Sequence, residues 1–144
     1  MNGVVVDASV AVKWYLTEVG SDSAFALLAD AKSLHAPQLL EIEVANAFLK
    51  NVIKGLADAT LWDFARLQLK HSVGTWYQSG PLVDGAFEIA CALSHPIYDC
   101  FYLALARGIG AVCVTADKWL LTRIAGTPYA NLAVELEQWQ GARV

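Results

Sequence analysis

The alternation of very short apolar runs with longer helical segments is the feature that most constrains the fold of this chain. The run Val4–Val6 consists only of β-branched residues, and Ala111–Val114 is almost as apolar, so both indicate buried strands. Strands that lack an alternating polar face are typical of a parallel sheet covered by helices on both faces. The sequence therefore predicts an α/β fold around a short parallel sheet.

Capping residues and chain breakers place the other elements. We expect further strands at 34–36, 73–77 and 132–134, and helices at 9–16, 21–30, 38–54, 58–69, 81–93, 98–107 and 117–124. Pro37 and Pro81 are expected to open helices, because proline favours the first turn. Gly55 and Gly108 are expected to close helices, because glycine readily ends them. Since no linker, repeat or low-complexity tract appears, residues 1–144 are expected to form a single domain.

The composition limits what kind of protein this can be. Hydrophobic residues make up 56% of the chain, above the roughly 45–50% usual in soluble domains. The longest stretch without Asp, Glu, Lys or Arg runs only from His71 to Val83, whereas a membrane-spanning helix needs about 20 mostly apolar residues. We therefore expect no membrane association, no targeting segment and a cytoplasmic location. The net charge of −4 disfavours a broadly basic, nucleic-acid-coating surface but leaves room for a local basic strip.

The chain has three cysteines, and their spacing matches no zinc-binding or redox motif. Cys91 and Cys113 lie in apolar stretches, where reduced cysteine behaves as a small hydrophobic residue. We expect both cysteines to be reduced and to lie in the core.

Three aspartates are expected to meet at one edge of the sheet. Asp7 directly follows the first strand, Asp117 follows the run "VCVTA", and Asp99 lies in the first turn of an apolar helix. Open parallel sheets carry their sites at the carboxyl ends of the strands. Two unit charges about 4 Å apart repel by about 4 kcal/mol at an effective dielectric constant of 20, so close acids need a proton or a cation between them. The pattern predicts a site for Mg²⁺ or Mn²⁺, which prefer carboxylate oxygens, and the alternative is that each acid only stabilises the start of a helix.

A polar stripe on the longest helix adds a fourth acid. Its members are spaced at i, i+3, i+7 and i+11 and share one face: Glu43, Asn46, Lys50 and Lys54. The stripe is either an ordinary solvated face or the wall of a crevice, with Glu43 at the acidic end and the two lysines as candidate phosphate contacts. Glu41 lies about 200° around the helix from Glu43 and is expected next to the packing side.

Four segments together resemble the motifs of PIN domains. They occur in order over nearly the whole chain and read "VVVDAS", "EVANAF", "YDCFYLALA" and "VTADKWLL". The likeness is to the VapC-type toxin ribonucleases of type II toxin–antitoxin systems. This resemblance implies a three-layer α/β/α sandwich with a short, mainly parallel central sheet. It also implies cleavage of RNA that depends on Mg²⁺, with Mn²⁺ able to substitute.

The resemblance also implies the residues of the site. It assigns metal binding and catalysis to four acids, Asp7, Glu43, Asp99 and Asp117. The polar residues that commonly line such a site are matched by Ser9, Asn46 and Thr115. RNA contacts are expected from Lys50 and Lys54. Cys100 stands where many relatives carry a smaller alanine, and Trp119 is bulky for its position, so both are expected to reshape the pocket.

The histidines are expected to be incidental, because His35, His71 and His95 lie outside the four motifs. The resemblance further implies a homodimer and inhibition by a VapB-type antitoxin. Apolar residues on two helices are expected to contribute to such interfaces, namely Trp14, Tyr15, Leu16, Trp62, Phe64 and Leu69.

Several other functions are compatible with parts of the pattern. A housekeeping RNA-processing PIN nuclease and a non-catalytic binding module, whose acids are helix caps, both remain alternatives. A phosphatase of the haloacid-dehalogenase type is disfavoured, since it needs a second acid at the position of Ser9. A receiver domain is disfavoured as well, because Asp7 stands alone at the end of its strand.

Overall fold

The computed structural model describes residues 3–31 and 33–139, and this part of the chain contains a five-stranded parallel sheet. The strand order is β3-β2-β1-β4-β5. The strands are β1 (Val4–Val6), β2 (Leu34–Pro37), β3 (Thr75–Tyr77), β4 (Val112–Thr115) and β5 (Ala133–Glu135). The expected parallel sheet is confirmed, and all strands run in one direction.

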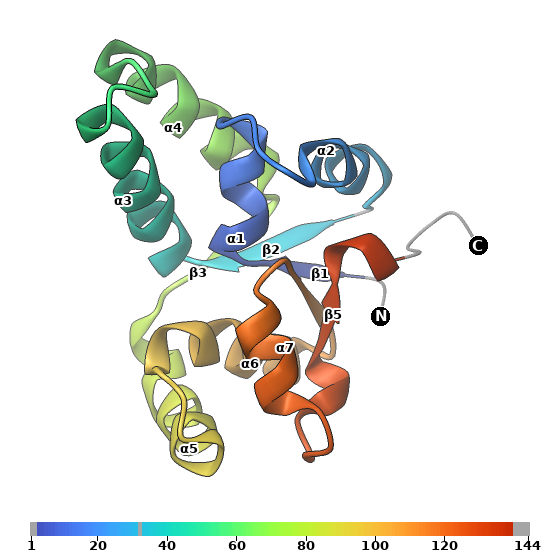
Figure 1. Cartoon of the computed structure of the whole chain (residues 1–144). Helices are drawn as coiled ribbons and strands as arrows, with labels where there is room; N and C mark the ends of the chain where they lie inside the picture. Colours follow the sequence, from blue (N-terminus) through green and yellow to red (C-terminus); the bar gives the residue numbers. More distant parts are fainter. Residues whose placement is uncertain (1–2, 32, 140–144) are drawn as a thin grey trace.

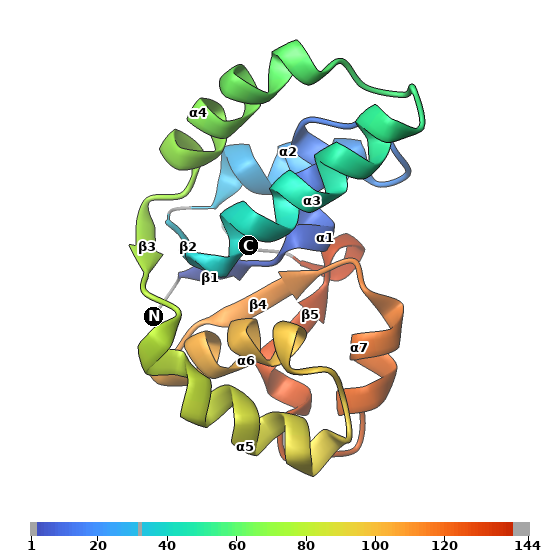
Figure 2. The ribbon, with the colours of Figure 1, turned by 90° about the vertical axis from the view of Figure 1, so that its left-hand side faces the viewer.

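Helices cover both faces of the sheet, which confirms the three-layer α/β/α sandwich (Figures 1 and 2). One layer contains α1 (Ala8–Ala11), α2 (Ser21–Asp30), α3 (Leu39–Ile53) and α4 (Trp62–Ser72). The other layer contains α5 (Val83–Leu93), α6 (Ile97–Ile109) and α7 (Lys118–Ile124). The two layers enclose the sheet, so the ends of its central strands lie between helices of opposite layers.

The centre of the core is formed by β1 and α6. Strand β1 pairs with β2 on one side and β4 on the other, with Val5 opposite both His35 and Cys113. All three valines of β1 are buried, which explains why its sequence has no polar alternation. Helix α6 lies against β1, β2 and β4 and buries, among others, Leu103 and Leu105. Burying one such leucine side chain stabilises the fold by about 1.5–3 kcal/mol, so α6 is anchored where its first turn must point toward the strand ends.

Some expected element boundaries are wrong for identifiable reasons. Pro37 ends β2 instead of opening a helix, and a strand terminus tolerates proline because no ladder donor is lost there. Gly108 lies inside α6, which ends at Ile109 and is capped by Gly110 in the left-handed conformation (φ 69°) that glycine adopts readily. The first helix is α-helical only over Ala8–Ala11 and continues as a 3-10 turn over Val12–Trp14.

Three expectations about burial are also wrong. Cys113 is buried as expected, but Cys91 is exposed because the buried positions of α5 are those of Ala86, Ile89 and Leu93. Of the residues expected at interfaces, two belong instead to the core, namely Trp14 and Leu69. Phe64, in contrast, exposes 63% of its surface on α4.

No single helix in the described ranges 3–31 and 33–139 is long and apolar enough to cross a membrane. The segments Gly80–Leu93 and Ile97–Ile109 meet the length and composition requirement only as a pair, and they are bent by 116°.

Candidate active site

The candidate site lies where the order of strands reverses. From β1 the chain proceeds outward to β2 and β3 on one side, and β4 and β5 complete the other side. Ligand sites of open parallel sheets lie at such a switch point, outside the carboxyl ends of the strands. Asp7 directly follows β1, and Asp117 lies two residues beyond the end of the neighbouring β4. Glu43 comes from α3 in one layer and Asp99 from α6 in the other, so the fold directs four acids toward one region.

A chain of hydrogen bonds ties the ends of β1 and β4 together. The Ser9 hydroxyl donates to Asp7 Oδ1 at 2.5 Å and accepts from the backbone N–H of Ala116 at 2.9 Å. Thr115 Oγ1 lies 3.3 Å from Ser9 Oγ, and the Thr115 hydroxyl also hydrogen-bonds to the Asp7 carboxylate. Thr115 Oγ1 in turn accepts from the backbone N–H of Asp117 at 3.0 Å. Every donor in this chain points toward the Asp7 carboxylate.

Burial makes Asp7 unusual among the acids of the chain. Only 3% of its surface is exposed, and desolvation raises the pKa of its carboxyl to about 7. The nearby negative charges of Asp99 and Asp117 contribute to this raised pKa, while the hydrogen bonds from Ser9 and Thr115 act against it. Asp7 makes no side-chain capping bond to α1, so helix capping does not explain its position. Near neutral pH this carboxyl must keep a proton or be balanced by a cation.

Asp117 combines a structural role with its place beside the other acids. Its Oδ1 accepts hydrogen bonds from the backbone N–H groups of Trp119 at 3.0 Å and Leu120 at 3.2 Å, so it caps α7. Burial raises the pKa of Asp99, and Asp117 raises it too, which shows that these two carboxyl groups are close. The capping explanation is thus correct for Asp117, but it leaves the second carboxylate oxygen without a capping partner.

His95 holds Asp99 in place, and the expectation that this histidine is incidental is wrong. Its Nε2 lies 2.7 Å from Asp99 Oδ2, and its side chain is completely buried. The ring packs against Trp119 with 4.5 Å between the ring centroids. Within the described residues the buried Nδ1 has no hydrogen-bond partner. Because an ionised carboxylate only accepts hydrogen bonds, Nε2 of His95 donates to Asp99.

Tyr102 is a second residue that sequence reasoning missed. It is buried in α6, and its hydroxyl donates a hydrogen bond to Glu43 Oε1. Burial raises the pKa of Glu43, and the charge of Asp99 raises it further. The only local signals were the i,i+4 spacing of His95 and Asp99 and the second tyrosine of "YDCFYLALA". Neither signal reveals that the partner of Tyr102 comes from another helix.

Glu41 and Glu43 lie on different sides of α3. Glu41 forms ion pairs with Arg66 at 2.8 Å and Lys70 at 3.6 Å, both on α4. The hydrogen bond from Arg66 is the main reason why the pKa of Glu41 is lowered. Glu43 faces α6 and the acidic region instead. The helical geometry therefore separates the two acids as the sequence analysis expected.

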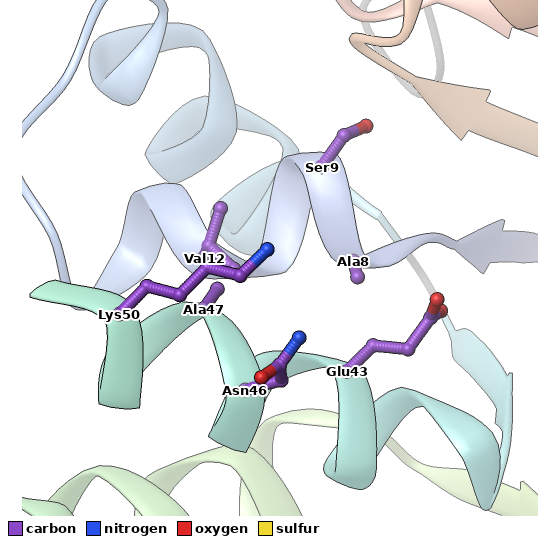
Figure 3. A pocket seen from close by; sticks show the side chains of 7 residues that line it. All are labelled: Ala8, Ser9, Val12, Glu43, Asn46, Ala47 and Lys50. Atoms are coloured by element: carbon purple, nitrogen blue, oxygen red, sulfur yellow. The ribbon is translucent and has the colours of Figure 1, made fainter.

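A cavity of about 260 Å³ opens between α1 and α3 beside the acids (Figure 3). It is lined by Ala8, Ser9, Val12, Glu43, Asn46, Ala47 and Lys50. Three members of the polar stripe of α3 thus line one cavity. Lys54 is not among the lining residues, because it lies at the C-terminal end of α3.

The donor atoms of the acidic region suit a hard divalent cation. Its four acids offer only carboxylate oxygens, which Mg²⁺ and Mn²⁺ prefer over nitrogen or sulfur ligands. Among residues 3–31 and 33–139, however, no three His, Cys, Asp or Glu side chains form a ready metal-binding group. The metal site therefore stays a prediction, which is supported by the raised pKa values of Asp7, Glu43 and Asp99.

Comparison with known proteins agrees with this architecture. The switch-point acids and the sandwich define an α/β protein with an acidic site at the strand ends. The model of the PIN domain family matches residues 4–126, and the chain belongs to this family. Ribonuclease VapC3 of Pyrobaculum aerophilum is 32% identical over 125 residues, which cover 81% of this chain and 91% of that protein. Ribonuclease VapC12 of Mycobacterium tuberculosis is 27% identical over 138 residues, which cover 92% of this chain and 98% of that protein.

Two solved structures share the fold. The crystal structure of PAE2754 from Pyrobaculum aerophilum has a TM-score of 0.70 and 23% identity, covering 94% of this chain and 84% of that one. A toxin–antitoxin complex from Klebsiella pneumoniae has a TM-score of 0.64 and 13% identity, covering 92% of this chain and 97% of that one.

Proposed function

We propose that this protein is a VapC-type toxin ribonuclease that hydrolyses RNA phosphodiester bonds with Mg²⁺, for which Mn²⁺ can substitute. The observation that carries the proposal is the convergence of four acids at the strand ends, where Asp7 is buried and has a pKa of about 7. Such a cluster needs positive charge nearby for its carboxyl groups to ionise. A cation bound there would also attract the negatively charged phosphate of an RNA substrate. The curated relatives named ribonuclease VapC support RNA as the substrate.

The four acids have distinct roles in this proposal. Asp7 and Asp99 would hold the cation, and the Asp117 carboxylate oxygen that does not cap α7 would add a further ligand, directly or through water. Glu43 helps to hold the cation or orients the attacking water, since Tyr102 fixes only one of its oxygens. A bound divalent cation supplies positive charge to the phosphate oxygens and lowers the pKa of a water molecule. In the hydrolysis, a water oxygen bonds to phosphorus and one ribose oxygen leaves with a proton.

The polar residues around the acids orient them and contact the substrate. Ser9 and Thr115 keep the Asp7 carboxylate in one orientation through their hydrogen bonds. Asn46 lines the adjacent cavity, and Lys50 and Lys54 provide positive charge for the RNA backbone. His95 keeps Asp99 oriented.

The proposed partners are a VapB-type antitoxin and a second copy of the chain, with the cytoplasm as the proposed location. The VapC names of the relatives and the toxin–antitoxin complex among the structural neighbours support the antitoxin. Support for an interface comes from large exposed apolar residues on α3 and α4, namely Ile42, Leu49, Ile53, Phe64 and Leu67.

The proposal is tested with purified full-length protein and labelled single-stranded RNA in Mn²⁺, Mg²⁺ or EDTA. Cleavage is expected in both metals and absent in EDTA. Asp7→Asn and Asp99→Asn should each lower the rate by at least about 100-fold, as the loss of a metal ligand does. Asp84→Asn, on an exposed position of α5, serves as the matched control and should cleave normally. Undiminished cleavage in EDTA, or by the two site variants, would overturn the mechanism.

A further inference from the structure

The cavity between α1 and α3 has three chemically different parts (Figure 3). Its wall toward both helices is apolar and is formed by Ala8, Val12 and Ala47. At one end lies the carboxylate of Glu43, which is part of the acidic region. At the other end lies the ammonium group of Lys50, and the Asn46 amide stands between them. The cavity therefore runs from the proposed place of bond cleavage to a positive charge.

Two polar side chains of this cavity, those of Asn46 and Lys50, are left without partners in the described part of the chain. No hydrogen bond or ion pair joins the side chains of Asn46 or Lys50 to residues 3–31 or 33–139. The opposite side of α3 differs, because Glu41 there is paired with Arg66 and Lys70. The donors and acceptors of α3 are thus satisfied toward α4 and available toward the cavity.

We propose that this cavity binds the nucleoside adjacent to the phosphate that is cleaved, and that Asn46 reads the edge of its base. The inference rests on the proposed ribonuclease function. With the cleaved phosphate at the acids, the face of the neighbouring base lies against Ala8, Val12 and Ala47. The amide of Asn46 offers one donor and one acceptor to the base edge, and Lys50 contacts the next phosphate.

The dimensions of α3 agree with a single nucleoside. Seven residues separate Glu43 from Lys50, and a rise of about 1.5 Å per residue places them roughly 10 Å apart along the helix axis. The cavity volume of about 260 Å³ lies just below the range of roughly 300–1,000 Å³ that is usual for pockets of whole small-molecule ligands. One nucleoside fits such a space better than an extended ligand does.

The apolar wall also selects the form of the RNA. A base can turn its face to Ala8, Val12 and Ala47 only when it is unstacked from its neighbours, and sequence-specific recognition of RNA commonly targets such splayed bases. The occupant is therefore an unpaired nucleotide of single-stranded RNA or of a loop. Because a two-bond contact between asparagine and a base edge discriminates by about 1–3 kcal/mol, Asn46 should set a base preference of at least about 5-fold.

The first experiment maps cleavage of a randomised single-stranded RNA library by sequencing, under single-turnover conditions in Mn²⁺. The wild-type protein should prefer certain bases at one position next to the cut. Asn46→Ala should reduce that preference by at least about 5-fold and leave the preference at other positions intact. Asn131→Ala, on an exposed position away from the cavity, should cut with the wild-type pattern. An unchanged pattern in Asn46→Ala, or an equal loss at every position, contradicts the inference.

A second experiment measures RNA binding without cleavage, in EDTA and in the Asp7→Asn background. Ala47→Leu fills the apolar wall and should weaken binding of a short RNA by several-fold. An RNA that lacks the base of the nucleotide next to the cleaved phosphate should bind equally to the Ala47→Leu protein and to the protein that keeps Ala47. If the wild-type protein binds and cuts RNA but neither Asn46→Ala nor Ala47→Leu has the expected effect, the proposed nucleoside site is wrong and the ribonuclease function stands. If the wild-type protein neither binds nor cuts RNA, the proposed function itself fails.

Discussion

The two walls of the site differ in how far their hydrogen bonds are already made. The wall at the strand ends contains Asp7, Ser9, Thr115 and Asp117, and a continuous chain of hydrogen bonds joins them. The wall on α3 contains Glu43, which is bound by Tyr102, and then Asn46, which has no partner in the described part of the chain. Hydrogen bonds hold the side chains of the strand-end wall in one arrangement, as catalysis requires. On the α3 wall, the Asn46 amide is available to bind a ligand.

This difference has an energetic side. Fixing Asp7 in a buried position costs stability when the carboxyl ionises, because desolvation disfavours its charge. Asn46 and Lys50 on the α3 wall carry no such cost, since both side chains are exposed to water when no ligand is bound. We infer that the strand wall tolerates few substitutions in an active protein, whereas the α3 wall can vary with the RNA that is bound.

The largest expected effect concerns the pH dependence of stability in the strand wall. The pKa of Asp7 is about 7 in the folded protein and 3.8 in its ordinary state. Between these values the folded state binds the proton more tightly, so the free energy of unfolding falls as the pH rises from about 4 to about 7. At about 1.36 kcal/mol per pKa unit, the loss is on the order of 4 kcal/mol, or roughly 10³-fold in the folding equilibrium. Asp7→Asn should remove this loss.

The measurement is urea unfolding at pH 4.5, 6 and 8 in EDTA for the wild-type protein and Asp7→Asn. The difference in free energy of unfolding between the two proteins at each pH reports on Asp7 alone. Acids whose pKa values are lowered, such as Glu41, contribute equally to both proteins. Asp84→Asn provides the exposed control. If the free energy of unfolding changes with pH in the same way for wild type and Asp7→Asn, burial of Asp7 does not cause the pH dependence of stability. Added Mn²⁺ should restore stability at pH 8 to the wild-type protein, because a ligand of the folded state stabilises it.

Asp7 and the strand order also show why much of the fold and part of the site could be predicted. Strands buried on both faces are continuous apolar runs without polar alternation, as in Val4–Val6. A charged residue directly after such a run marks the end of the strand. The helix end near Gly108 was misplaced because glycine can be accommodated inside a helix at a cost of about 1 kcal/mol. Local sequence gives the type of an element more reliably than its last residue.

The residues that sequence reasoning missed share one property, which is that their role depends on a partner in space. Tyr102 acts through Glu43, which is 59 residues away in the chain, and no periodicity records that contact. His95 lies four residues before Asp99, outside α6 and before the "YDCFYLALA" motif, so the sequence pattern does not mark it as part of the site. Only packed coordinates show that its ring is buried beneath Trp119.

The second largest effect compares two acids on the same helix. Glu43→Gln should lower the single-turnover rate in saturating Mn²⁺ by about 100-fold, because Glu43 faces the acids and Tyr102. Its melting temperature should stay within a few degrees or rise, since a charge is removed beside Asp99. Glu41→Gln should keep near-normal activity, because its partners Arg66 and Lys70 lie on α4. Loss of activity in the Glu41 variant with retention in the Glu43 variant would reverse the assignment.

A smaller effect is expected when the strand wall keeps its acids but loses one support. His95→Phe preserves the ring packing on Trp119 and removes the hydrogen bond to Asp99 Oδ2. We expect Mn²⁺ affinity, measured by titration calorimetry, to fall about 10-fold, the lower end of what a supporting residue contributes. His95→Gln can still donate a hydrogen bond and should recover part of the affinity. The exposed His71→Phe is the matched control, and equal affinities in all four proteins would refute a positioning role.

The smallest effect concerns the open wall and separates two lysines on one stripe. Lys50 lines the cavity, whereas Lys54 lies one turn further at the end of α3. Lys50→Ala should raise KM for a short RNA by about 3- to 5-fold with little change in kcat, because an exposed phosphate contact contributes mainly to binding. It should also reduce the slope of log affinity against log salt concentration by about one. Lys54→Ala should change KM by less than about 2-fold. A larger effect from Lys54 than from Lys50 would move the path of the RNA away from the cavity and toward the C-terminal end of α3.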